Sequence, residues 1–257
     1  STDLQENPGY LTQATQETAV AGNQVLQQLK VDVVFVMDTT VSMRPYIKST
    51  LEVIKGVAKG ITEDPILAES IYFGAWGYRD PVDQIEGIGY TTYNYTPELQ
   101  SVDKFIETLS QVEVTKVDSV DYPEDVFSGI ADALAKTTWT PGAMRVMVLL
   151  GDAPGHKLGH KYNVSGQDPS SLRTLANDAK VYLFALHVKE PRAKRFHTEA
   201  EEQFRALSRN KGMGQDSAYF AVSSRDMTAF AQAAADLTGS LNAMLAQAKQ
   251  GKVMAGP

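Results

Sequence analysis

The chain has 257 residues, no cysteine, and 31 acidic against 24 basic residues, which gives a net charge of -7. The missing cysteine excludes disulfides, thiolate catalysis and cysteine-ligated metal sites. The acidic balance argues against a nucleic-acid partner, because phosphate binding needs a clustered excess of Lys and Arg. The apolar runs have strand length and fall short of the ~20 residues that a membrane helix needs, so no membrane segment is predicted.

Hydrophobic periodicity predicts strands that alternate with helices along the chain. Apolar, often β-branched runs are typical of strands buried on both faces and occur at residues 31–37, 71–78, 145–150, 180–187 and 217–222. Helical spacing of apolar residues covers residues 9–29, 43–61, 98–110, 123–138, 169–179, 197–210 and 225–248. Residues 84–96, rich in Tyr, Thr and Gly, are predicted to form an extended, hairpin-like excursion.

This alternation predicts an α/β fold with a doubly wound, mostly parallel central sheet flanked by helices. We expect one domain over residues 31–250, an N-terminal helical extension over residues 1–30 and a short tail over residues 251–257. Ligands of such sheets bind at the carboxyl ends of the strands. Polar residues that directly follow a predicted strand are therefore the candidates for a functional site.

Two predicted strands end in acidic residues. Asp38 follows the first strand and is followed in turn by Thr40 and Ser42, while Asp152 follows the strand over residues 145–150. A carboxylate with hydroxyls two and four residues later offers three oxygen ligands on one loop, which suits a hard cation such as magnesium. We expect Asp38 and Asp152 to face each other across one sheet edge.

A third acidic loop precedes the helix predicted from Pro123. Asp121 and Glu124 both lie there, and either could supply a further oxygen ligand. The alternative is that they are ordinary acids at a helix N-terminus, where the helix dipole favours negative charge. The sequence leaves both interpretations open.

These motifs resemble the metal-ion-dependent adhesion site (MIDAS) of von Willebrand factor A-type (VWA) domains, over about residues 31–245. The resemblance rests on four motifs in the same order, at residues 33–40, 77–80, 121–125 and 151–156. It implies a Rossmann-like VWA fold in which Asp38, Thr40, Ser42 and Asp152 hold one divalent cation, magnesium first, with manganese or calcium as alternatives.

The second loop departs from the family pattern. Many VWA domains have a Thr there, whereas this chain offers Glu124 or, as the alternative, Asp121. A carboxylate ligand would add negative charge, hold the cation more tightly and leave it less electrophilic towards a partner's acid.

The resemblance implies binding rather than catalysis: a protein partner contributes an acidic side chain to the cation. The chain looks most similar to the C-terminal VWA region of bacterial serine/threonine kinases associated with type VI secretion, which implies a periplasmic sensing or partner-binding module. It has no kinase glycine-rich loop, His-Arg-Asp motif or Asp-Phe-Gly motif. No kinase domain is therefore included.

Four further residues are candidates for supporting the cation or contacting the partner: Thr39, Arg79, Asp80 and His156. Arg79 and Asp80 are expected to form a local ion pair. His156 and His160 have the spacing of a zinc helix, but the neighbouring Gly and Pro residues disfavour a helix. We therefore expect His156 to act, if at all, as a hydrogen-bond donor beside the metal.

Two other functions compete with the binding module. One is a structural scaffold with a vestigial metal site, because a Glu in place of Thr could mean that the site is remodelled. The other is a metal-dependent phosphohydrolase of the haloacid dehalogenase type, but Thr40 stands where such enzymes have a second Asp. Neither a Gly-x-Ser-x-Gly motif around Ser42 nor a phosphate-binding loop supports an enzyme.

Overall fold

The structure is a computed structural model that describes residues 29–212, 218–223 and 226–250. Most of the helix expected over residues 9–29, and the tail over residues 251–257, lie outside the described residues. Among the described residues, no helix has both the length and the apolar character needed to cross a membrane.

Six strands form one sheet in the order β3-β2-β1-β4-β5-β6. All neighbouring pairs are parallel except β2 and β3, which are antiparallel. Every residue of β1, β4 and β5 is buried, as expected for central strands covered on both faces. The strands are β1 (Val31–Asp38), β2 (Ile71–Tyr78), β3 (Thr92–Asn94), β4 (Met144–Gly151), β5 (Val181–Val188) and β6 (Tyr219–Val222).

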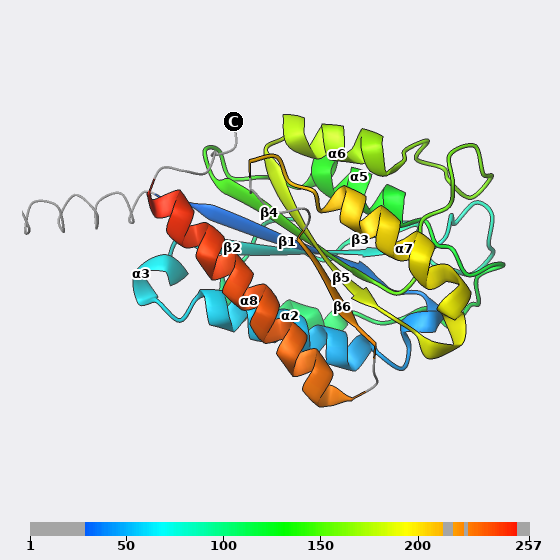
Figure 1. Cartoon of the computed structure of the whole chain (residues 1–257), viewed down its shortest axis with the longest axis horizontal. Helices are drawn as coiled ribbons and strands as arrows, with labels where there is room; N and C mark the ends of the chain where they lie inside the picture. Colours follow the sequence, from blue (N-terminus) through cyan, green and yellow to red (C-terminus); the bar gives the residue numbers. More distant parts are fainter. Residues whose placement is uncertain (1–28, 213–217, 224–225, 251–257) are drawn as a thin grey trace, which may run out of the picture.

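Helices cover both faces of this sheet (Figure 1). One face packs against α2, α4 and α8, and the other packs against α5, α6 and α7. The α-helices are α2 (Ile47–Ile61), α3 (Pro65–Ala68), α4 (Val102–Thr108), α5 (Val126–Lys136), α6 (Pro169–Asp178), α7 (Lys194–Leu207) and α8 (Met227–Lys249). Short 3-10 helices are η1 (Val41–Met43), η2 (Leu109–Gln111) and η3 (Pro191–Ala193). The predicted α/β class, with a mostly parallel sheet between helical layers, is confirmed.

Several predicted boundaries are shifted for local reasons. The helix expected from residue 43 begins at Ile47, because the 3-10 turn η1 intervenes. The helix expected from Pro123 begins at Val126, because the Asp125 side chain caps it by accepting a hydrogen bond from the backbone N–H of Ser128. The hairpin-like excursion over residues 84–96 contributes only the three-residue edge strand β3.

Strand register brings the ends of β1, β2 and β4 to one level. Asp38 pairs with Tyr78 on β2, and the preceding Met37 pairs with Leu150 on β4. At Gly151, a Cβ atom would lie 3.3 Å from the Cβ of Asp38 and would collide with the Tyr78 hydroxyl. Glycine at this position therefore lets the loops after β1 and β4 approach each other.

Candidate metal centre

Close polar contacts connect the loop after β1 with the loop after β4. The Thr40 hydroxyl donates to Asp38 Oδ1 at 2.6 Å, and the Thr40 backbone N–H donates to the same oxygen at 2.8 Å. The Thr40 and Ser42 hydroxyl oxygens are 3.0 Å apart, and the Ser42 hydroxyl donates to Asp152 Oδ1 at 3.0 Å. The structure thus brings Asp38, Thr40, Ser42 and Asp152 together, as the sequence predicts.

The side chains of Asp38 and Asp152 are completely buried. Burial raises the pKa of Asp38 well above its ordinary value, and the charge of Asp152 raises it further. Burial also raises the pKa of Asp152. Asp38 Oδ2 has no hydrogen-bond partner. A buried carboxylate oxygen without a partner lowers the stability of the fold unless a ligand or a proton binds to it.

These donors fit a hard divalent cation in their chemistry. The group offers two carboxylates and two hydroxyls, all oxygen ligands of the kind that magnesium, manganese and calcium accept. Within the described residues, no three His, Cys, Asp or Glu side chains converge into a metal-holding group. The group therefore differs from an all-carboxylate or imidazole site, because two of its four donor side chains are hydroxyls.

Tyr122 supports Asp152 from the second loop. Its hydroxyl donates to Asp152 Oδ2 at 2.7 Å, and its ring stacks on Phe196 with centroids 4.8 Å apart. Sequence reasoning missed this residue, although it lies between the two acids Asp121 and Glu124 that were singled out. The missing signal is spatial, because only the folded loop places an aromatic hydroxyl against the end of β4.

Glu124 lies in the same acidic region as the first and third loops. Its side chain is 2% exposed, and the Ser119 hydroxyl lies 3.2 and 3.0 Å from its two carboxylate oxygens. Burial raises its pKa well above the ordinary value, and the charges of Asp38 and Asp80 raise it further. The acid that caps α5 is Asp125 instead, so the helix-start interpretation belongs to Asp125.

Asp121 is placed differently from Glu124. Its side chain is 39% exposed, and Oδ1 lies 3.0 Å from Nε2 of the buried His156. The hydrogen bond to Asp121 orients the His156 ring, which also stacks on His160 with centroids 4.7 Å apart. A backbone hydrogen bond joins the second loop to the loop after β4 as well, since the Glu124 N–H donates to the Pro154 carbonyl at 2.9 Å.

The expected ion pair between Arg79 and Asp80 is not formed. Arg79 instead donates to the carbonyls of Ile88 at 2.7 Å and Glu113 at 2.8 Å, and its guanidinium lies 3.9 Å from the centroid of the Tyr90 ring. The reason is that two backbone carbonyls and the Thr39 hydroxyl already accept the hydrogen bonds of the Arg79 guanidinium. Asp80 is completely buried, and burial raises its pKa.

Thr39 belongs to the Arg79 network rather than to the acidic one. Its hydroxyl donates to the Tyr78 carbonyl at 3.0 Å and accepts from Arg79 Nε at 3.2 Å. Through these contacts Thr39 connects the end of β1 to the end of β2, and its hydroxyl is not placed as a ligand of a cation at Asp38.

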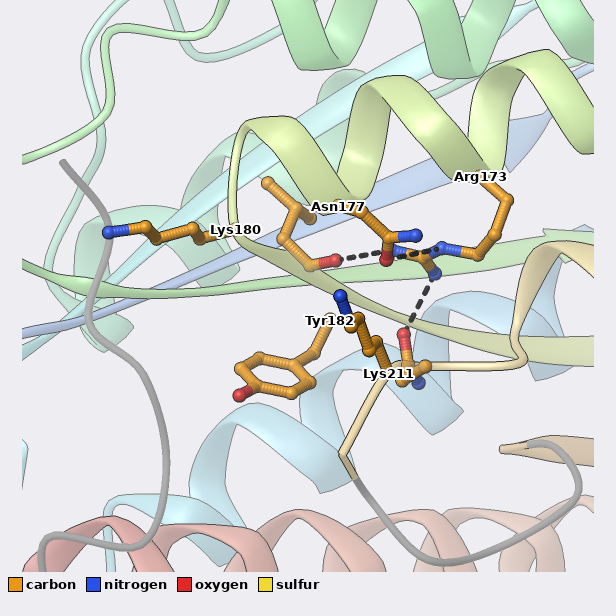
Figure 2. Close-up of a pocket in the computed structure, with 7 residues that line it drawn as sticks. Arg173, Asn177, Lys180, Tyr182 and Lys211 are labelled. Carbon is orange, nitrogen blue, oxygen red and sulfur yellow. Dashed lines mark hydrogen bonds between the residues drawn. The ribbon is translucent and has the colours of Figure 1, made fainter.

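A pocket of about 400 Å³ opens beside Ser42 and Tyr122 and is also lined by Glu190, Arg192 and Phe196. Another pocket, of about 30 Å³, lies near the start of β5 and is lined by Arg173 and Lys211 (Figure 2). The second pocket has room for little more than a water molecule. Only the first adjoins the buried acids.

Comparison with known proteins places the fold and leaves the family open. No family model matches the chain. The alpha-protein kinase vwkA of Dictyostelium discoideum is 30% identical over 151 residues, which is 56% of this chain and 22% of that protein. The chain thus spans about a fifth of the length of the curated relative that it matches.

Solved structures with the same fold have low sequence identity. Proximal thread matrix protein 1 from the mussel byssus aligns with a TM-score of 0.57 at 12% identity, over 90% of this chain and 48% of that one. Another structure of that mussel protein, with a zinc occupied MIDAS motif, gives 0.57 at 11% identity over the same shares. The open form of the pilus adhesin SpaC from Lactobacillus rhamnosus GG gives 0.53 at 16% identity, over 82% and 30%. The chain therefore has a fold of the VWA type.

Proposed function

We propose that the chain is a metal-dependent protein-binding module, which holds one divalent cation at the carboxyl edge of its sheet and binds an acidic side chain of a partner protein there. The observation that carries this proposal is the pair of buried carboxylates, Asp38 and Asp152, linked through two hydroxyls while Asp38 Oδ2 lacks a partner. Two like charges in a buried site are stabilised by a cation between them.

Asp38, Thr40, Ser42 and Asp152 would hold the ion. Glu124 is our choice for the second-loop acid that adds its charge to the site, although in this structure it does not converge with Asp38 and Asp152 into a three-acid group. Glu124 is buried beside Asp38 and its pKa responds to that charge, whereas Asp121 is engaged with His156. When bound, a divalent cation supplies a positive centre that accepts an oxygen ligand from outside. The residues of the chain orient the site: Ser42 and Tyr122 each hold one oxygen of Asp152.

Magnesium is the cation we propose, with manganese or calcium as alternatives, because the donors are all oxygens. The zinc occupied MIDAS motif of the mussel protein supports a divalent ion at such a position in this fold. We also propose that the module binds without turnover. We further propose a kinase-associated role, which the match to the Dictyostelium kinase supports. A place in the periplasm and a link to type VI secretion are proposed from the motif resemblance alone.

The test is thermal and urea unfolding of the chelated protein, before and after addition of magnesium or manganese. A cation at ~100 times its dissociation constant should stabilise the parent by about 2.7 kcal/mol. Asp38→Ala and Asp152→Ala should both lose this stabilisation, while Asp178→Ala, which removes an exposed acid at the end of α6, should keep it. The same titration of Glu124→Gln and Asp121→Asn identifies the second-loop ligand.

An unchanged unfolding curve of the parent at saturating cation would reject the proposal and favour the scaffold with a vestigial site. Turnover of a chromogenic phosphate ester, dependent on the same cation and lost in Asp38→Ala, would instead favour the phosphohydrolase.

A further inference from the structure

The pocket beside the metal centre has two unlike walls. Ser42 and Tyr122 form the wall on the side of the buried acids, and both also hold Asp152. A second wall comes from the segment after β5, where Arg192, Arg195 and Phe196 line the pocket. Any group that enters this pocket therefore meets both Ser42 of the metal centre and this second wall.

The second wall is basic in an otherwise acidic chain. Residues 189–195 contain four Lys or Arg residues and one acid, Glu190, while the whole chain has a net charge of -7. Glu190 is 5% exposed, and Oε1 accepts from both the backbone N–H and Nε of Arg192 at 3.1 Å. The single acid of the segment is thus engaged within the protein, and the Arg192 side chain is still 79% exposed.

Stacked aromatic rings connect the basic wall to the metal centre. The Arg195 guanidinium carbon lies 4.6 Å from the centroid of the Phe196 ring, and Phe196 stacks on Tyr122 with an interplanar angle of 16°. The aromatic ring holds the exposed Arg195 over the pocket at low entropic cost, since a guanidinium prefers to stack on an aromatic face. Among the described residues, Arg195 forms no ion pair with a carboxylate.

We propose that this pocket recognises an acidic segment of the partner that carries at least two carboxylates, one for the metal centre and one for Arg192 and Arg195. The inference rests on the proposed function and adds the class of partner to it. Guanidinium groups bind carboxylates through paired hydrogen bonds, and an exposed basic wall also speeds the approach of an acidic partner. A partner with a single acid would fill only half of the pocket.

The test uses two blocked peptides, Gly-Asp-Gly-Asp-Gly and Gly-Asp-Gly-Asn-Gly, titrated into the isotopically labelled full chain with saturating magnesium and followed by NMR. The parent should bind the first peptide roughly fivefold more tightly, as expected for exposed charge pairs. The double variant Arg192→Gln with Arg195→Gln should bind both peptides equally. A control with the same loss of charge, Lys48→Gln with Lys59→Gln on exposed positions of α2, should keep the preference.

Unfolding of the same proteins with and without magnesium separates the two proposals. A cation shift in the parent, together with equal binding of both peptides or no binding of either, would overturn the inference and leave the metal module intact. A preference that persists in the Arg192 and Arg195 double variant would also overturn it. Without any cation shift in the parent, the proposed function fails first and the two-carboxylate mechanism fails with it.

Discussion

Two groups of polar side chains lie at opposite ends of the sheet and differ in how fully their hydrogen bonds are satisfied within the protein. Near the start of β5, Arg173, labelled in Figure 2, lies beside the chain segments that accept its hydrogen bonds. It donates to the carbonyls of Leu207 and Val181 and to Asn210 Oδ1, each at 2.8 Å. Burial lowers its pKa to about 10, so the guanidinium stays charged at neutral pH. At the carboxyl end of β1, Asp38 keeps an oxygen without a partner and has a second acid beside it.

The difference separates polar groups that hold the fold together from polar groups that are left for a ligand. A buried charge surrounded by internal partners fastens neighbouring elements, because removing it leaves those partners unsatisfied. Buried acids that repel each other cost stability in the folded chain, and such a cost is typical of functional sites. We therefore interpret the small pocket at Arg173 as structural, although it is a well-formed hollow, and propose the open pocket at Ser42 as the functional one.

The largest expected effect is at the structural end. Arg173→Met should lower the free energy of unfolding by about 3 kcal/mol, because two carbonyls and Asn210 lose a charged hydrogen-bond donor. Lys211→Met, which removes an exposed charge from the same pocket, should change it by less than about 0.5 kcal/mol. Urea unfolding of both variants measures this. Equal effects would mean that the Arg173 network contributes nothing specific.

The next effect is at the metal centre. Tyr122→Phe removes the hydroxyl that holds Asp152 Oδ2, and we expect the magnesium affinity to fall about tenfold, as for other residues that orient a metal ligand. Tyr93→Phe, at a tyrosine with an exposed fraction of 50%, should leave the affinity unchanged. Titration of magnesium into the chelated proteins gives both values. An unaltered affinity in Tyr122→Phe would show that Asp152 needs no support from the second loop.

The smallest effect is a change in stability caused by Asp38→Asn, and its direction depends on whether the cation is present. In chelator, Asp38→Asn should stabilise the chain by about 1 kcal/mol at neutral pH, because it removes one of two repelling buried charges; in magnesium, the variant should be less stable than the parent. Burial and the charge of Asp152 raise the pKa of Asp38 in the folded state. The folded parent therefore holds this proton more tightly than the unfolded chain, and loses the resulting stability as the pH rises through the raised pKa.

The stability gap between Asp38→Asn and the parent in chelator should accordingly widen as the pH rises above about 4, the ordinary pKa of an Asp side chain, and close at lower pH. Comparison at each pH removes the opposite contribution of His187, whose pKa burial lowers to about 3, since both proteins contain it. A stability gap that does not depend on pH would mean that burial does not raise the pKa of Asp38.

The sequence predicts the fold well where one signal dominates. Strands such as Val31–Asp38 and Met144–Gly151 are apolar throughout, and burial on both faces requires that. Boundaries set by side-chain capping are less predictable: Asp125 starts α5 after a Pro and two acids, any of which suits a helix start. Residues 92–94 form a strand because β2 offers them an edge, which no local pattern reveals.

The site is predictable in its acids and hydroxyls and not in their surroundings. Asp38, Thr40, Ser42 and Asp152 follow strands, so parallel topology alone brings them together. The contacts of Arg79 with the carbonyls of Ile88 and Glu113 depend on loops whose paths the sequence does not specify. The basic run over residues 189–195 was visible as a charge reversal after a buried strand, and a count of local charge at each strand end would have found it.

The two borders of the sheet have a consequence for behaviour at high concentration. At one border β3 has three residues, and at the other β6 has four, whereas the strands between them have eight each. Long exposed borders pair with those of other molecules and nucleate aggregates, and short ones resist such pairing. Crowded copies of this domain should therefore resist the joining of their sheets into fibrils.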